Sequence, residues 1–248
     1  MFHIWQLHKF FKRYTIMYMR IHRFFSHQEL VGKTTMLITH GSIVNQMKNV
    51  FRFTKGDKVI LFDNSGYDFT AVIEGYEKDS VSFSIIETNE NTVLPTRETY
   101  LFASVVKKDT FEWISEKATE LGVSHIVPIV SSRSEKKDLN LERIQKIIIE
   151  AAEQSGRGTL PVLHEVIELE SALIKYAHIK SIAWHPLSVK FVSQDIADSI
   201  GAYIGPEGGW SQEELDLFKT HGVHSRSLGP QILRSETAVI AVISRLVF

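Results

Sequence analysis

Residues 204–238 read IGPEGGWSQEELDLFKTHGVHSRSLGPQILRSETA and contain two glycine-containing turns. The first turn is residues 205–209 (GPEGG) and the second is residues 228–234 (LGPQILR). Each is expected to follow a short apolar strand and to precede a helix. Glycine lets a backbone approach a ligand closely, and proline fixes the shape of a loop. Two such loops side by side are suited to holding a flat, partly polar small molecule through main-chain groups.

These two turns, continued by residues 235–238 (SETA), resemble the signature of the SPOUT methyltransferases. Weaker similarities to that family extend over most of the chain, from about Met19 to Phe248. They are residues 20–25 (RIHRFF), 49–52 (NVFR) followed by Gly56 and Asp57, 116–123 (EKATELGV), and 153–157 (EQSGR) followed by Pro161. Within the family, the chain is most similar to enzymes that methylate N3 of a uridine in 16S rRNA of the small ribosomal subunit.

The resemblance implies an α/β fold with two domains. A small N-terminal PUA-like β-barrel would bind RNA, and a C-terminal SPOUT-type α/β domain would contain a trefoil knot. We expect the barrel at 19–90, the methyltransferase domain at 91–248, and an extension of undefined role at 1–18. The family also implies a homodimer in the cytoplasm, with S-adenosylmethionine bound in a bent form by the knotted loops.

The resemblance places the cofactor against the two turns and a third loop at His185 and Pro186. The residues expected at the cofactor are His185, Pro186, Gly205, Glu207, Gly208, Gly209, Leu228, Gly229, Ile232, Leu233 and Thr237. Electrostatics bear on the same point, because the helix after the first turn would attract an anion at its N-terminus. A phosphate site is open on that ground alone. Glu207 would repel a phosphate, however, and suits a sulfonium or hydroxyl group better.

Catalysis at uridine N3 requires help, because the nitrogen carries a proton and is a poor nucleophile until that proton leaves. We expect Arg234 to stabilise the resulting anion, whose charge spreads onto the carbonyl oxygens. Glu236 would orient Arg234 or the uridine. The general base stays open among Glu236, His185 and water. A local ion pair between Arg234 and Glu236 is the structural alternative.

The RNA contacts expected from the matched motifs are Arg20, Arg23, Arg52 and Arg157. The chain has a formal net charge of −1, which argues against strong non-specific nucleic-acid binding. Affinity for 16S rRNA must therefore come from local patches. Candidates are Lys48, Arg52, Lys55 and Lys58, and then Arg133, Lys136 and Lys137. The alternative is that these are solvated surface charges.

One position departs from the family pattern. Gln231 stands where the family usually has Arg, so the second turn reads LGPQILR rather than LGPRILR. Glutamine keeps hydrogen-bonding capacity but loses the charge. The change leaves two alternatives open: a methyltransferase with another RNA position as its target, and a non-catalytic RNA-binding or ribosome-assembly factor.

The amino-acid composition limits which reactions the chain can catalyse. The chain has 248 residues, 44% of them hydrophobic and 23% charged, which suits one large or two modest domains. No apolar run approaches the ~20 residues that span a bilayer. The absence of cysteine excludes disulfides, thiolate zinc sites and cysteine nucleophiles. Methylation of a pyrimidine carbon 5 generally needs such a nucleophile, so a nitrogen or oxygen target is more plausible.

The first eighteen residues (MFHIWQLHKFFKRYTIMY) contain three basic residues and no acid. An interfacial amphipathic helix and a targeting segment are both open. An upstream start codon or a poorly ordered extension is the explanation that we favour.

Hydrophobic patterns predict the elements. Alternating apolar residues from Lys58 to Ser104 predict a small barrel, and residues 88–98 predict a linker. Strands are then expected at 100–106, 125–130, 181–184, 202–204 and 223–228. Helices are expected from Asp109 with Glu112 in a capping box, from Leu141 with Asn140 as N-cap, from Ser211 with Glu214 in a capping box, and at 236–247.

Three further motifs do not indicate a function. GKT at residues 32–34 lacks the earlier glycine of a phosphate loop, because His27 stands there. The sole G-x-G, at residues 156–158, lies at a helix end rather than after an early strand. His221 and His224 have no ligand set around them, so we expect a surface pair and no metal.

Overall fold

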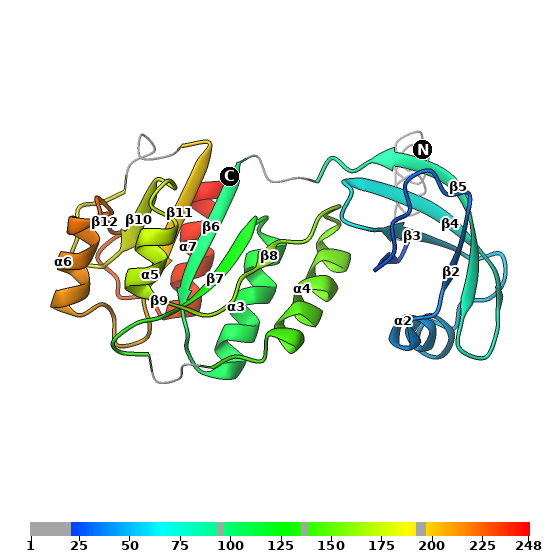
Figure 1. The fold of residues 1–248 in the computed structure, drawn as a ribbon, viewed down its shortest axis with the longest axis horizontal. Coiled ribbons are helices and arrows are strands. Elements are labelled where there is room, and N and C mark those ends of the chain that lie inside the picture. The colour runs from blue at the N-terminus through cyan, green and yellow to red at the C-terminus, as the bar shows by residue number, and fades with distance from the viewer. Residues whose placement is uncertain (1–20, 94–96, 135–137, 192–196) are drawn as a thin grey trace, which may run out of the picture. The chain divides into compact units, whose positions relative to one another are not determined.

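The computed structural model describes residues 21–93, 97–134, 138–191 and 197–248. It divides into two compact units, Met1–Asn91 and Thr92–Phe248, which are coloured blue to cyan and green to red in Figure 1. The predictions for residues 1–18, Met19, Arg20, Lys136 and Lys137 fall outside the described residues. No helix in the described parts of the chain is long and apolar enough to cross a membrane.

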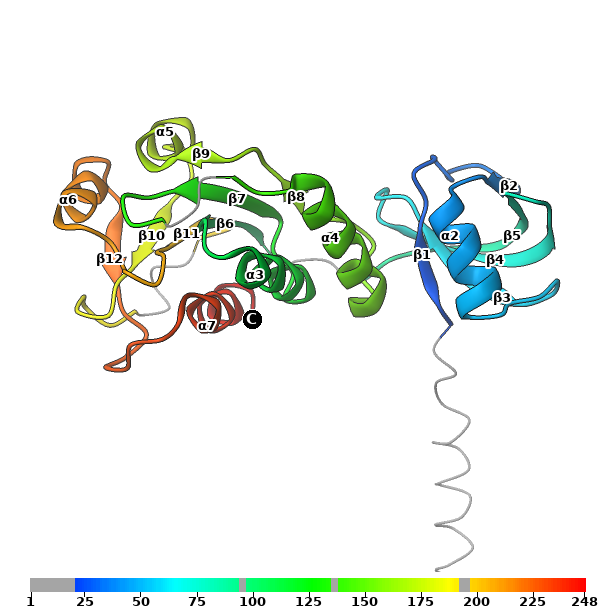
Figure 2. The same ribbon diagram turned by 90° about the horizontal axis from the view of Figure 1, so that it is seen from below.

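The first unit is built on a five-stranded sheet with the order β1-β3-β4-β5-β2. Its strands are β1 (Arg23–Phe25), β2 (Thr35–Ile38), β3 (Lys58–Phe62), β4 (Tyr67–Tyr76) and β5 (Val81–Glu90). All pairs are antiparallel except β1 with β3. Two register shifts in the β4–β5 pair, which raise local twist, interrupt its ladder. The short helix α2 (Gly41–Asn45) continues into the π-helical turn η1 (Gln46–Val50), and it lies beside β1 in Figure 2.

The alternation predicted for this unit is confirmed. Phe69, Ala71 and Ile73 of β4 are buried, and so are Val81 and Phe83 of β5. They pack against the buried side of α2 and η1 in one apolar cluster. One face of the sheet therefore makes the core of this unit, as a period of two requires.

The second unit contains a parallel sheet with the strand order β12-β10-β11-β6-β7-β8, and β9 also pairs with β7. The strands are β6 (Glu98–Ser104), β7 (His125–Val130), β8 (Val162–Leu163), β9 (Ile167–Glu168), β10 (Ser181–Trp184), β11 (Ser199–Ile204) and β12 (His224–Arg226). Every pairing in it is parallel. The carboxyl ends of the strands therefore meet at one edge of the sheet.

Helices cover both faces of this sheet, as Figure 2 shows. One face carries α3 (Lys108–Glu120), α4 (Leu141–Ser155) and α7 (Ser235–Val247), and the other carries α5 (Leu169–Lys175) and α6 (Gln212–Thr220). Each face has its own apolar cluster. The layered α/β arrangement expected from the alternating pattern is confirmed.

Two helix starts agree with the sequence and one does not. The Asn140 side chain accepts a hydrogen bond from Arg143 N at the start of α4, and Ser211 and Glu214 form the predicted capping box of α6. The capping box at Asp109 is wrong, because α3 begins at Lys108 without a side-chain cap. Glu112 bonds instead to Arg143 Nε at 2.6 Å. The expected linker was also too long, since β6 already begins at Glu98.

The final helix is buried on several sides, as its apolar sequence predicts. Val239, Val242, Ile243 and Leu246 of α7 have no exposed surface. They belong to the apolar cluster that joins α3, α4 and the sheet. Because α7 supplies so much of that cluster, the core of the second unit depends on this helix.

Candidate functional site

A hollow of about 130 Å³ opens where β10, β11 and β12 end. Three loops, one after each of these strands, form its walls, and the first turn of α7 closes it. The lining residues are Trp184, His185, Pro186, Ile204, Gly205, Pro206, Glu207, Gly209, Trp210, Arg226, Ser227, Leu228, Gly229, Gln231, Ile232, Leu233, Ser235 and Ala238. Ligands of open α/β sheets bind outside the carboxyl ends of the strands, which is where this hollow lies.

The structure brings the predicted cofactor residues together, with two exceptions. Gly208 and Thr237 do not line the hollow, whereas the other predicted residues do. The residues from the three loops are separated by up to about fifty positions in sequence, and the sheet places them side by side because β10, β11 and β12 are neighbours.

The two predicted catalytic residues lie next to the hollow in sequence but do not line it. Arg234 is the exposed N-cap residue of α7, and Glu236 is half-buried in the first turn of that helix. Both belong to the described part of the chain, where no ion pair joins them. Their roles stay predictions.

The first glycine turn is held by its own backbone and by α7. Gly209 N donates to Pro206 O at 2.9 Å, and Gly209 adopts a φ of 66°, which favours glycine. Ser235 Oγ donates to Gly205 O at 2.9 Å, so the turn is fixed to the start of α7. A Cβ on Gly205 would lie 3.2 Å from the Trp210 indole, which leaves little room for a side chain.

A second clamp comes from the loop that follows β7. Arg133 Nη1 donates to Gly208 O at 2.6 Å and to Trp210 O at 3.4 Å. Glu214 Oε1 accepts from Ser132 N at 2.8 Å, while its Oε2 accepts from Ser211 N at 2.8 Å. The sequence suggested an RNA patch at Arg133, but this guanidinium is engaged in holding the glycine turn.

The other two loops are tied together by main-chain bonds. His185 N donates to Arg226 O, Ser227 N donates to Val189 O, and Phe191 N donates to Ser227 O, each at 2.9 Å. The segment after β12 is thus hydrogen-bonded to the segment after β10. This pairing keeps the His185 loop and the second glycine turn at fixed positions on either side of the hollow.

Sequence reasoning missed several lining residues, of which the tryptophans are the most informative. Trp210 Nε1 donates to Trp184 O at 3.1 Å. Trp184 is 7% exposed, and its Nε1 finds no hydrogen-bond partner among the described residues. A buried donor without a partner costs free energy unless a ligand or water accepts from it. Trp184 directly precedes His185 at the end of a strand, and that position was the signal that could have revealed it.

Gln231, the departure from the family pattern, also lines the hollow. Its Oε1 lies 3.3 Å from the position where a Cβ on Gly229 would be. The amide therefore covers the second glycine turn closely, and a side chain at position 229 would press against it.

Two of the residues predicted to contact RNA are buried in the structure, so those predictions are corrected. Arg157 is 3% exposed, and its guanidinium donates to Thr119 O, Val123 O and Thr159 O. Burial lowers the pKa of Arg157 to about 10. Arg157 therefore connects α3 to the segment after α4 through hydrogen bonds, and it is not a surface residue.

Arg23 is the second correction. Its side chain is 7% exposed, forms an ion pair with Asp68, and lies over the Phe62 ring at 4.9 Å from the centroid. Arg52 remains available, since it is exposed in the turn after η1.

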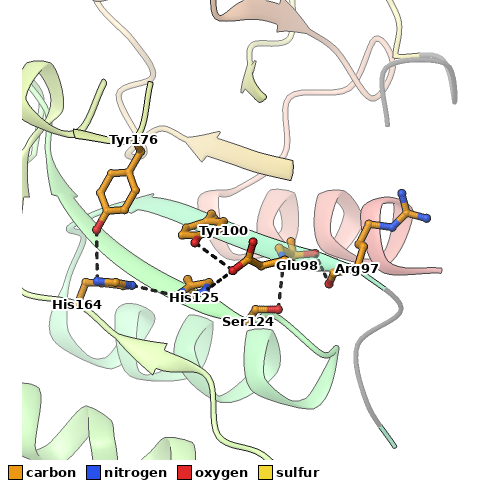
Figure 3. Close-up of polar contacts among 8 residues, drawn as sticks. Arg97, Glu98, Tyr100, Ser124, His125, His164 and Tyr176 are labelled. Carbon is orange, nitrogen blue, oxygen red and sulfur yellow. Dashed lines mark hydrogen bonds and ion pairs between the residues drawn. The ribbon is translucent and has the colours of Figure 1, made fainter. Parts of the chain in front are cut away.

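A polar network occupies the opposite edge of the sheet, at the amino ends of β6 and β7 (Figure 3). His125 Nε2 contacts Glu98 Oε1 at 3.1 Å, and His125 Nδ1 contacts His164 Nε2 at 3.1 Å. Tyr176 Oη contacts His164 Nδ1 at 3.2 Å. These contacts join the four side chains into one continuous network from Tyr176 to Glu98.

The network shifts the acidity of its members. Burial alone would raise the pKa of Glu98, but hydrogen bonds from His125 and Tyr100 help to outweigh it and lower that pKa. Burial, and then the positive charges of His125 and Lys175, lower the pKa of His164. Burial and the neighbouring Glu98 raise the pKa of Tyr100 to about 12. These residues lie away from the hollow, and metal-binding groups of histidine and carboxylate are absent from the described residues.

The fold and the hollow define a class of protein. Residues 93–247 match the RNA methyltransferase domain family, and residues 41–86 match the RNA methyltransferase PUA domain family. The first match covers more than half of the chain. The PUA match at 41–86 lies within the first structural unit, and the methyltransferase match at 93–247 lies within the second.

The relatives narrow the class. Ribosomal RNA small subunit methyltransferase E of Bacillus subtilis is 32% identical over 235 residues, covering 88% of this chain and 91% of the relative. The protein of the same name from Rickettsia conorii is 29% identical, covering 92% and 95%. The crystal structure of the Neisseria gonorrhoeae protein of that name, bound to S-adenosyl methionine, aligns with a TM-score of 0.84 at 29% identity, covering 91% and 96%. The chain belongs to the ribosomal RNA small subunit methyltransferase E family.

Proposed function

We propose that this chain transfers a methyl group from S-adenosylmethionine to N3 of a uridine in 16S rRNA of the small ribosomal subunit, in the cytoplasm. The observation that carries the proposal is the hollow at the carboxyl ends of β10, β11 and β12, lined by both glycine turns. The bound cofactor in the related Neisseria gonorrhoeae structure supports it. The PUA-family match of residues 41–86 supports RNA as the substrate.

The residues of the hollow fit S-adenosylmethionine. Trp184 and Trp210 offer flat apolar walls, and the buried Trp184 Nε1 offers a donor that lacks a partner among the described residues. The glycine turns expose main-chain groups, because Gly205 and Gly229 leave no side chain between backbone and ligand. The carboxylate of Glu207 lies at the rim, where it favours a positive ligand over a phosphate. When bound, the cofactor supplies a methyl group on a positively charged sulfur.

The chain's own residues must manage the uridine. Arg234 is exposed at the N-cap of α7 beside the hollow, so its guanidinium can reach a carbonyl oxygen of the base and stabilise negative charge there. Glu236, in the first turn of the helix, can orient that guanidinium or accept the N3 proton, and His185 at the hollow is the other candidate base. The base must leave any stack to enter the site.

We also propose a homodimer. Several large apolar side chains are exposed around the two loops that the main-chain bonds tie together: Leu187 (88%), Val189 (75%) and Ile232 (86%). Such a group marks an interaction surface more often than a solvated one. Light scattering after gel filtration should give twice the 28.3 kDa chain mass, whereas a monomer at micromolar concentration would reject the dimer.

A trefoil knot is the last part of the proposal. β12 lies at the sheet edge beyond β10, yet α7 packs against β11, β6 and α3. The chain must therefore return past the connection between β10 and β11, to which Ser227 is bonded. An experimental density map traced through residues 185–199 decides it: a chain that passes outside this connection would be unknotted.

The function is tested by calorimetry and by nucleoside analysis. The full chain should bind S-adenosylmethionine, and small subunits from a strain lacking the gene should gain N3-methyluridine when incubated with chain and cofactor. Reactions without cofactor serve as the control. Absence of binding heat would favour a non-catalytic RNA-binding factor, and a different methylated nucleoside would move the target to another RNA position.

A further inference from the structure

A second cavity, of about 240 Å³, lies near the amino ends of β10 and β12, away from the proposed cofactor site. Its walls come from the end of α5, the turn that leads into β10, and the turn between α6 and β12. The lining residues are Leu173, Tyr176, Ala177, Ile179, Lys180, Ser181, Ile182, Tyr203, His221, Gly222, Val223, His224 and Arg226. Of these residues, Arg226 alone also lines the proposed cofactor site.

Apart from its two tyrosines, the ionisable groups that line the cavity are basic. Lys180, His221, His224 and Arg226 line it, and the described residues of its lining include neither aspartate nor glutamate. The two sequence segments that frame it, residues 175–181 (KYAHIKS) and 219–226 (KTHGVHSR), also lack any acid. In a chain with a net charge of −1, such a local excess is not set by overall composition. It makes a site suited to an anion.

The floor of the cavity is rigid and aromatic. Tyr203 is buried and stacks on Phe102 with ring centroids 4.2 Å apart. Tyr176 is fixed by its contact with His164, at 3.2 Å, and by the Phe102 ring, at 5.1 Å. Leu173, Ile179 and Val223 add apolar wall. A cationic rim above an apolar floor matches a phosphate attached to a sugar better than it matches a free, fully hydrated ion.

Three of the four basic groups of the rim lack a carboxylate partner among the described residues. Among the described residues, no ion pair involves Lys180, His221 or His224. Lys219, by contrast, contacts Asp216 at 3.4 Å and does not line the cavity. The sequence predicted a surface pair at His221 and His224, but it did not predict that both residues line one cavity.

The cavity is connected to the proposed cofactor site along the sheet edge. Arg226 lines both hollows, and β12, which separates them, is the last strand of the sheet. A strand of three residues spans about 10 Å. A strand of B-form DNA advances about 3.4 Å per nucleotide, and on that scale roughly three nucleotides cover the distance. A strand whose base enters the first hollow can thus place a phosphate in the second.

We propose that this cavity binds a phosphodiester of the substrate RNA, a few nucleotides from the methylated base. The inference rests on the proposed function for its choice of RNA over a small phosphorylated molecule. Lys180 and His224 supply the contacts at the rim, and Arg226 joins them to the site of methyl transfer.

The experiment measures binding of the full chain to a fluorescent single-stranded oligoribonucleotide across a salt series, without cofactor. Lys180→Gln with His224→Gln should weaken binding by about 3- to 10-fold. It should also flatten the slope of log K against log salt by about 0.7 for each phosphate that the variant no longer neutralises. Affinity for S-adenosylmethionine should not change, because neither residue lines the first hollow.

Lys146→Gln, on the exposed side of α4, is the matched loss of charge and should leave both quantities as they are. Unchanged RNA affinity in the double variant, or an equal loss in Lys146→Gln, overturns the proposal. Inorganic pyrophosphate is the second probe: if its binding is lost while RNA binding is intact, the site takes a small anion instead. Because no arm uses methyl transfer, a chain that methylates nothing would reject the proposed function and leave this result standing.

Discussion

Arg234 stands where a side chain can act on the base without holding the cofactor. It is exposed, at the N-cap of α7, and it does not line the hollow. We therefore expect Arg234→Ala to lower kcat about 100-fold or more, while the Kd for S-adenosylmethionine stays within about 3-fold. Single-turnover kinetics and calorimetry separate the two. Arg245→Ala, at the exposed end of the same helix, is the control, and equal losses of kcat and cofactor affinity would assign Arg234 to binding or folding.

Gly201 in β11 is a position where only hydrogen fits. A Cβ there would lie 2.3 Å from Ser181 Oγ and 2.8 Å from Phe102 Cε2. Gly201→Ala should lower the free energy of unfolding by about 1–3 kcal/mol, because it forces the stacked aromatic layer apart. Gly75→Ala is the matched change, since its nearest neighbour would be 4.0 Å away. Urea melts that show the same loss in both variants would contradict the steric argument.

What a single residue does can be read from sequence when its partners are local. The glycine turns were predictable because glycine and proline act on their own backbone, and the turns do line a hollow. Arg157 was not, because the carbonyls that it binds, Thr119 O and Val123 O, lie 38 and 34 positions away. The local sequence does not distinguish an arginine that hydrogen-bonds to distant carbonyls from an arginine that faces RNA.

At the scale of elements, the loop after β7 acts as a brace for the first glycine turn. Arg133→Gln removes a charged donor to Gly208 O and Trp210 O, a loss of about 1 kcal/mol at an exposed position. We expect roughly 5-fold weaker binding of S-adenosylmethionine, with kcat at saturating cofactor less affected. Arg133→Lys should recover part of the affinity. A variant with normal cofactor affinity but weaker RNA binding would return Arg133 to the basic patch first suggested by the sequence.

The helix starts show the limit of prediction for elements. Asn140 and Ser211 cap their helices with groups that lie within three residues, so the pattern alone was sufficient. The same pattern failed at Asp109, because Glu112 has a better partner in Arg143, which belongs to the next helix. The strands and helices that alternate along the sequence indicated a layered α/β domain, but which strand ends share one hollow depends on the sheet order, which the sequence did not predict.

For the whole molecule, the network of Figure 3 makes stability depend on pH. The pKa of His164 is lowered from 6.5 and that of Glu98 from 4.5, so in both cases the unfolded chain binds the proton more readily. The stabilisation is present at neutral pH, begins to fade as pH falls below 6.5 through His164, and fades further below 4.5 through Glu98. Acidification should therefore lower Tm.

His164→Asn should flatten the dependence of Tm on pH between about 7 and 5.5, whereas His178→Asn, at an exposed histidine outside the network, should not. Thermal melts followed by circular dichroism in matched ionic strength give the comparison. A wild-type Tm that rises on acidification, or a slope unaltered by His164→Asn, would show that the network does not govern acid stability.

The placement of α7 has a consequence for how the protein is made. Helix α7 is synthesised after the other elements of the second unit, and yet its apolar side chains fill the cluster against which β6, β11 and α3 pack. The first unit can fold while synthesis continues, since residues before 92 form a compact unit. The second unit has to wait for the thirteen-residue helix α7. A nascent chain can therefore hold a folded first unit before the core of its second unit is complete, and a chain truncated before α7 should keep the first unit while losing the second.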